Sequence, residues 1–104
     1  MISLDDYVTD VLMRDLVGHD RRPASFLVYL WIAAEQRRSN GMVQASYQQI
    51  AESIGISKSS AQAAVGWLIK RELLDCTKKT VTAIPRYRVL TPWRDREARS
   101  RRRS

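Results

Sequence analysis

The stretch that decides the fold is residues 47–65, which read YQQIAESIGISKSSAQAAV. Its apolar residues recur three and four positions apart, as on one face of a helix, at Ile50, Ala51, Ile54, Ala61 and Val65. A small residue at Ala51 allows two helices to cross closely, Gly55 supplies a sharp turn, and Ile56 fills the space beneath it. The stretch therefore predicts two short helices joined by a tight turn.

Serines mark where both helices begin. Ser46 lies three residues before Gln49, and this S-x-x-Q spacing is typical of a capping box. Ser57 stands just after the turn and is a good N-cap for a helix that runs from Lys58 to about Arg71. The two serines therefore predict the residue at which each helix begins.

A further helix is expected upstream, over residues 24–38. Pro23 suits its first position, and Ser39, Asn40 and Gly41 end it. Its middle, FLVYLWIAA, is apolar all round, so two faces need cover. Residues 42–45 then predict a short edge strand.

A β-hairpin is expected downstream. Residues 73–77 look extended, Lys78 and Lys79 lie at a turn, and residues 80–90 return as a second strand interrupted by Pro85. In the second strand Tyr87 and Val89 alternate with Arg86 and Arg88. This alternation places the aromatic ring inward and the two guanidinium groups outward.

The first twenty residues predict an amphipathic helix, capped by Ser3 and stopped by Gly18, that pairs two copies of the chain. Its apolar stripe consists of Leu4, Tyr7, Val8, Val11, Leu12 and Leu16. We expect three segments: this leader at 1–20, a central domain at 21–91 and an arginine-rich tail at 92–104.

Charge divides along the same lines. The chain has 104 residues, enough for one domain, and a net charge of +7. The leader carries −4, residues 21–93 carry +7 and residues 94–104 carry +4. A basic body and tail favour a polyanionic partner. The tail arginines would neutralise phosphates or serve only as a solubilising end, and they include Arg99, Arg101, Arg102 and Arg103.

Several functional classes are excluded by composition. Cys76 and His19 are the only residues of their kinds, so no disulfide framework, His/Cys metal site or cofactor is expected. Cys76 in a strand predicts a small buried apolar residue. The longest apolar run, residues 26–34, is too short to span a membrane, and the acidic start is unlike a signal peptide. We therefore expect a cytoplasmic protein, and without paired catalytic groups, not an enzyme.

With its helix, strand, helix, turn, helix and hairpin in this order, the chain over residues 24–90 resembles the winged helix-turn-helix family of bacterial DNA-binding proteins. The resemblance implies a mainly α-helical fold with a small β-hairpin, helix 58–70 in the major groove, and the hairpin as a wing beside it. The positions that it carries over as DNA contacts are Ser46, Tyr47, Gln48, Lys58, Ser59, Ser60, Gln62, Ala63, Lys78, Lys79, Arg86 and Arg88.

The resemblance has two departures on the recognition helix. Relatives often carry Arg or Lys where this chain has Ala63 and Gly66, so base readout is left chiefly to Gln62, which can pair bidentately with adenine. Trp67 and Ile69 are apolar where many relatives are polar, and we expect them to meet the wing, the leader or a second subunit.

The resemblance implies a transcriptional regulator or a replication or partition accessory factor that binds double-stranded DNA as a homodimer. Two alternatives stay open. One is a protein–protein adaptor that uses Trp67, Ile69 and the exposed face of residues 26–34, and the other is an RNA-binding protein.

Overall fold

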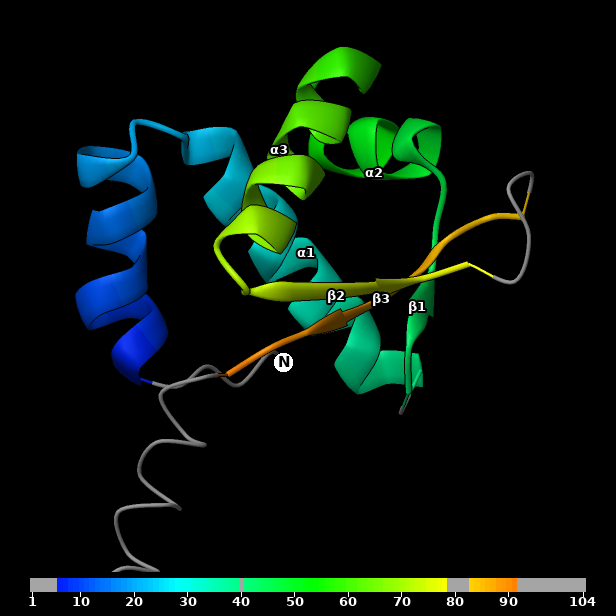
Figure 1. Ribbon diagram of the computed structural model, residues 1–104, viewed down its shortest axis with the longest axis horizontal. Coiled ribbons are helices and arrows are strands. Elements are labelled where there is room, and N and C mark those ends of the chain that lie inside the picture. The colour runs from blue at the N-terminus through cyan, green and yellow to red at the C-terminus, as the bar shows by residue number, and fades with distance from the viewer. Residues whose placement is uncertain (1–5, 40, 79–82, 92–104) are drawn as a thin grey trace, which may run out of the picture.

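The computed structural model describes residues 6–39, 41–78 and 83–91. These residues form a mainly helical fold with a small antiparallel sheet (Figure 1). The elements run in the order η1 (Val8–Leu12), η2 (Arg14–His19), α1 (Pro23–Ser39), β1 (Val43–Gln44), α2 (Tyr47–Ile54), α3 (Lys58–Lys70), β2 (Leu74–Thr77) and β3 (Arg86–Val89).

The sheet has the strand order β1-β3-β2, with both pairs antiparallel. Tyr87 on the central strand lies opposite Val43 of β1 and Cys76 of β2. Tyr87 is buried while Arg86 and Arg88 are exposed, which confirms the alternation expected from sequence. The predicted hairpin and edge strand therefore join into one sheet. Its central strand, β3, is the last of the three in sequence.

The helix starts are confirmed at atomic detail. Ser46 Oγ accepts a hydrogen bond from the Gln49 N–H at 3.1 Å, and the Ser46 N–H donates to Gln49 Oε1 at 3.1 Å. Ser57 Oγ accepts from the Ser60 N–H at 3.1 Å. Gly55 has φ +90°, a left-handed conformation that residues with a side chain rarely adopt, and it ends α2.

Helix α1 is held to the sheet and to α3 by side chains as well as by apolar packing. The Tyr29 hydroxyl donates to the Leu90 carbonyl at 3.1 Å, and the Val89 N–H donates to Gln36 Oε1 at 2.9 Å. On the α3 side, the buried Ser25 hydroxyl donates to the Ala64 carbonyl at 3.4 Å. These bonds fix α3 and the hairpin relative to one scaffold helix.

The leader is helical, but its two segments are π-helices, whereas the three- and four-residue spacing predicted an ordinary amphipathic helix. A π-turn holds more residues than an α-turn, so positions four apart stay on one side. Val8, Leu12 and Leu16 are buried at that spacing, while Val11, three residues after Val8, is exposed.

The predicted stop at Gly18 is wrong. The helix continues through Gly18 to His19 and ends at Asp20, and Arg21 then takes φ +55° to reverse the chain. Burial of Leu16 holds this last turn in place, so a glycine within it does not break the helix. The expected cap at Ser3 and the start of the stripe at Leu4 lie outside the described residues.

The leader packs against α1 and covers part of its apolar surface (Figure 1). Its buried side chains join the same core as those of α1, α3 and the sheet. They are therefore unavailable to a second copy, which would have to use the outward residues Val11, Met13 and Val17. Pairing through the leader, and the division into three segments, stay predictions.

The predicted burial of Cys76 is wrong, because its side chain is exposed. A free cysteine in a strand is usually buried, but burial also requires that neighbouring elements pack over that position. Tyr87 opposite it lies on the central strand, between two neighbours, whereas Cys76 lies on the edge strand β2.

Replacing Leu16 with Ala should lower the free energy of unfolding by about 2–5 kcal/mol, because Leu16 is 0% exposed and its loss leaves a cavity between leader and core. Urea unfolding measures the change. Val17→Ala is the matched control, since Val17 is 40% exposed, and it should cost less than about 1 kcal/mol. Equal effects would show that the leader is not part of the core.

Candidate nucleic-acid interface

Helix α3 presents one broad exposed face. Its inner side consists of Ala61, Ala64, Val65 and Leu68, all buried. The outward positions, all exposed, are Lys58, Ser59, Ser60, Gln62, Ala63, Gly66, Ile69 and Lys70. The helix bounds and the exposure of Lys58, Ser59, Ser60, Gln62, Ala63 and Gly66 agree with the sequence prediction. Ile69 is 42% exposed, and its expected contact with a second subunit stays a prediction. Ser59, Ala63 and Gly66 have short side chains or none, so they project little from the helix surface. Lys58 and Lys70 lie at the two ends of the exposed face.

Three serine hydroxyl groups form a network at the start of α3. The Ser57 hydroxyl donates to Ser60 Oγ at 2.8 Å and lies 3.2 Å from Ser59 Oγ. Because Ser57 has a single proton and gives it to Ser60, the second contact must be donated by Ser59. The Ser60 hydroxyl thus accepts a bond and keeps its own proton for another acceptor.

The three candidates at the start of α2 are partly engaged in the fold. Ser46 caps the helix, and the Gln48 amide donates to Glu52 Oε1 at 2.9 Å. Tyr47 is half-buried and packs against the core next to Tyr87, whose pKa is raised by its burial. The positive end of the α2 dipole is the feature of this helix start best suited to an anion.

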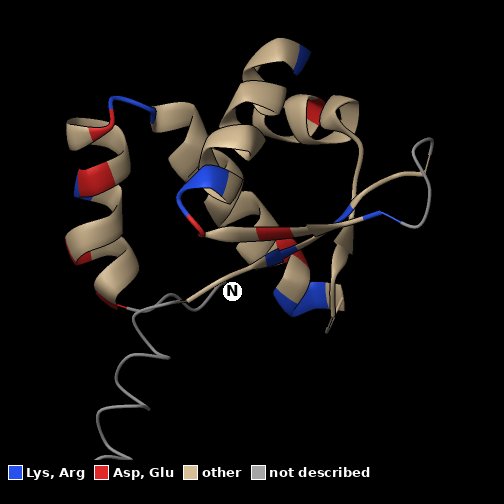
Figure 2. Cartoon of the chain, viewed as in Figure 1, with Lys and Arg blue, Asp and Glu red and all other residues tan. Residues whose placement is uncertain are grey.

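The hairpin carries exposed cations at Lys78, Arg86 and Arg88. Arg88 Nη2 lies 3.5 Å from Asp75 Oδ2 on the neighbouring strand, and both side chains are about half-exposed, so this pair holds the guanidinium only weakly. Lys79 lies outside the described residues, as do the tail arginines Arg99, Arg101, Arg102 and Arg103. Figure 2 shows basic residues at the start of α3 and on the hairpin, and acidic residues both on the leader and on the rest of the chain.

A cluster of side chains that was not predicted from the sequence joins the end of the leader to the end of α3. The Asp20 side chain is only 4% exposed. Its Oδ2 accepts a hydrogen bond from Trp67 Nε1 at 3.0 Å and lies 3.4 Å from Arg71 Nε, while its Oδ1 lies 3.0 Å from His19 Nδ1. A buried carboxylate with partners on both oxygens is a firm anchor.

The indole of Trp67 completes this cluster. The Arg22 guanidinium lies 4.3 Å from the centre of the ring and the Lys70 ammonium 5.5 Å from it, both within the range of cation–π attraction. Trp67 therefore meets the leader's end, one of the three partners expected from sequence. The only local signal was the pair of arginines in residues 19–23 (HDRRP), a segment that the sequence indicates only as a short polar connection between the leader and α1.

The electrostatics of Asp20 follow from these contacts. Burial alone would raise its pKa, but the hydrogen bonds from His19 and Trp67 and the charge of Arg71 outweigh that effect. The pKa of Asp20 is therefore lower than its ordinary value of 3.8, and the carboxylate is ionised at neutral pH.

A hollow of about 340 Å³ lies beside this cluster, between the connection and α3. Two arginines, Arg21 and Arg22, lie on its border. The remaining lining residues are Asp20, Pro23, Ala24, Ser25, Ser60, Ala63 and Ala64. The hollow thus adjoins the exposed face of α3.

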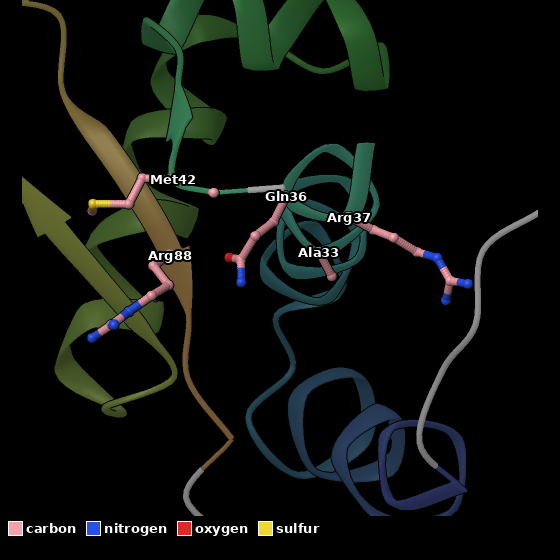
Figure 3. A pocket seen from close by; sticks show the side chains of 6 residues that line it. Ala33, Gln36, Arg37, Met42 and Arg88 are labelled. Carbon is pink, nitrogen blue, oxygen red and sulfur yellow. The ribbon is translucent and has the colours of Figure 1, made fainter. Parts of the chain in front are cut away.

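A second hollow, of about 560 Å³, lies near the C-terminal end of α1. Figure 3 shows Arg37 and Arg88 on its border pointing away from each other, so they do not converge on one ligand. Gln36 is engaged with the Val89 N–H. This end of α1 also carries the negative end of the helix dipole, which disfavours an anion there.

Comparison of the chain with protein-family models, curated proteins and solved structures found no match. Among the described residues, no helix has both the length and the apolar character needed to cross a bilayer. The same residues contain no group of three or more His, Cys, Asp or Glu side chains that could hold a metal ion.

Asp20→Asn should lower the free energy of unfolding by about 1–3 kcal/mol at pH 7, because it removes the charge that faces Arg71. A lowered folded-state pKa stabilises the fold above the ordinary pKa of 3.8, and this contribution is lost as the pH falls through the folded value. Urea unfolding at pH 7 and below pH 3 should show the two proteins converging in acid.

The matched control is Asp10→Asn, since Asp10 is exposed on the leader. It should change stability by less than about 0.5 kcal/mol. A stability difference between Asp20→Asn and the original chain that persists unchanged below pH 3 would contradict the role assigned to the Asp20 charge.

Proposed function

We propose that the chain is a winged helix-turn-helix protein that binds double-stranded DNA, as a transcriptional regulator or a replication or partition accessory factor. One observation carries the proposal. Two serine-capped helices are joined by a sharp turn at Gly55, and the second exposes a polar face while an adjoining hairpin exposes Lys78, Arg86 and Arg88. This combination suits a helix in the major groove with a wing on the neighbouring backbone.

The side chains of α3 suggest how the duplex would be read. Gln62 can form a bidentate pair with adenine, and Lys58 can reach a guanine edge or a phosphate. Ala63 and Gly66 offer no hydrogen-bonding side chain, so few base contacts are available. Affinity would therefore come mainly from phosphate contacts, and sequence preference would be modest.

The charge distribution supports this division of roles. The leader carries −4 and the rest of the chain +11. Half of the described acidic residues lie on the leader, so the excess of positive charge on the rest of the chain would steer the protein to the duplex (Figure 2).

A protein-binding adaptor is the second candidate, and exposed apolar side chains favour it. Leu27 on α1 is 45% exposed and Ile69 on α3 is 42% exposed. Trp67, which the adaptor would also need, is occupied by Asp20 and Arg22. Removing Lys58 and Gln62 together distinguishes the two, because only DNA binding should be lost.

Binding to a 30-base-pair duplex should weaken steeply with salt, with the slope of log K against log salt falling by about 0.9 for each phosphate neutralised. Lys58→Gln should reduce the magnitude of that slope by about 0.9, the contribution of one phosphate contact. Fluorescence anisotropy across a salt series measures both quantities.

Arg14→Gln is the control for that series, since Arg14 is an exposed cation on the acidic leader. It should leave the slope unchanged. A slope near zero for the unmodified chain, or equal binding to structured RNA in competition, would contradict duplex DNA as the partner.

Pairing predicts a solution mass twice the 12.0 kDa of one chain. Light scattering after size exclusion measures it, and Val17→Glu should halve the mass by placing a charge on the leader's outward apolar side. Thr9→Glu, at another exposed leader position, is the control. A single-chain mass for the original protein would remove the pairing prediction and its two-fold DNA site, while leaving DNA binding intact.

A further inference from the structure

The hollow between the connection and α3 brings together two parts of the chain that lie far apart in sequence. One side is formed by residues 20–25 and the other by Ser60, Ala63 and Ala64 of α3. Because Ser60 and Ala63 are exposed, a duplex lying against α3 would pass over this hollow. Its volume of about 340 Å³ leaves room for a phosphate group.

The charge of the hollow favours an anion. Arg21 and Arg22 border it, and the first turn of α1, which contains no acidic residue, contributes the positive end of a 17-residue helix. Among the described residues that line the hollow, Asp20 is the only acidic one. Both of its oxygens already have partners, and its side chain is only 4% exposed, so its charge is largely compensated.

The small side chains of α3 explain why the hollow is open. A long side chain at Ala63 would extend across it, whereas a methyl group leaves it accessible. Ser60 contributes a hydroxyl proton that its contact with Ser57 does not use. Position 63 of the recognition helix carries no cation, and Arg21 and Arg22 supply positive charge beside it instead.

Arg21 is the side chain best placed to act on a ligand. Arg22 is already stacked on Trp67, and its backbone N–H donates to the Leu16 carbonyl at 2.7 Å. On the other side, the Asp20 N–H donates to the Asp15 carbonyl at 2.7 Å. Arg21 thus lies, with φ +55°, between two anchored neighbours at the edge of the hollow.

We infer that this hollow binds a phosphate group of the DNA backbone, with Arg21 supplying the charge and Ser60 a hydrogen bond. The inference rests on the proposed function and adds a contact from outside the helix pair and the wing. It assigns the leader a role in binding, because its last residue, Asp20, anchors the connection that carries Arg21.

The test compares the salt dependence of duplex binding in three Arg21 variants. Arg21→Gln and Arg21→Gly both remove the cation, and glycine also tolerates the left-handed backbone at this position, so loss of folding is avoided. Both should reduce the salt slope by about 0.9 and weaken binding by the same factor for every duplex sequence. Arg21→Lys should keep the original slope.

Arg14→Gln serves as the matched control, as an exposed arginine on the leader away from the hollow. If the original chain binds with a steep salt slope but Arg21→Gln and Arg21→Gly behave like Arg14→Gln, the phosphate site is wrong while DNA binding stands. If the original chain itself shows no salt-dependent binding, the proposed function falls and the site with it. Urea unfolding of each variant confirms that a change in slope is not a loss of fold.

Discussion

The need to cover helix α1 on several sides is the constraint on which the rest of the structure depends. Its central residues are apolar around the whole circumference, and burial of such surface is the main favourable contribution to folding. The sheet, α3 and the leader each pack against it. Tyr29, Gln36 and Ser25 add hydrogen bonds that set where the sheet and α3 lie. The exposed face of α3 and the hairpin are thus positioned by a helix that belongs to neither.

The leader has two roles within the fold. Its apolar side completes the core, and its last residue, Asp20, bonds to Trp67 and pairs with Arg71 on α3. A change in the leader would therefore be felt at the end of α3. This coupling needs no large movement, because the partners are already in contact and one of them is a buried charge.

Most of the fold could be predicted because its signals are local. Ser46 with Gln49, Ser57, and Gly55 at a left-handed position each act within a few residues, so the sequence is enough to place α2 and α3. The leader's helix type was missed because a spacing of three and four fits more than one helix. Cys76 was misplaced because the usual burial of a free cysteine does not hold on an edge strand with little cover. The Asp20–Trp67 contact joins residues 47 positions apart, and no local pattern encodes it.

The candidate interface likewise has one part that the sequence could predict and one part that it could not. The exposed set on α3 follows from helix periodicity, whereas Arg21 enters only because the chain folds back beside Ala63.

Within the part of the chain that the structure describes, β2 lies at an edge of the sheet, and the hairpin's cations lie close to it. A strand at a sheet edge offers unpaired backbone groups that another chain can join, and natural proteins discourage this with short edges and charge. Here β2 has four residues and β1 only two, and Lys78, Arg86 and Arg88 are exposed on or next to the sheet. Like charges on two approaching copies would repel at these edges. We therefore expect Lys78, next to the edge strand β2, to discourage two copies from pairing edge to edge.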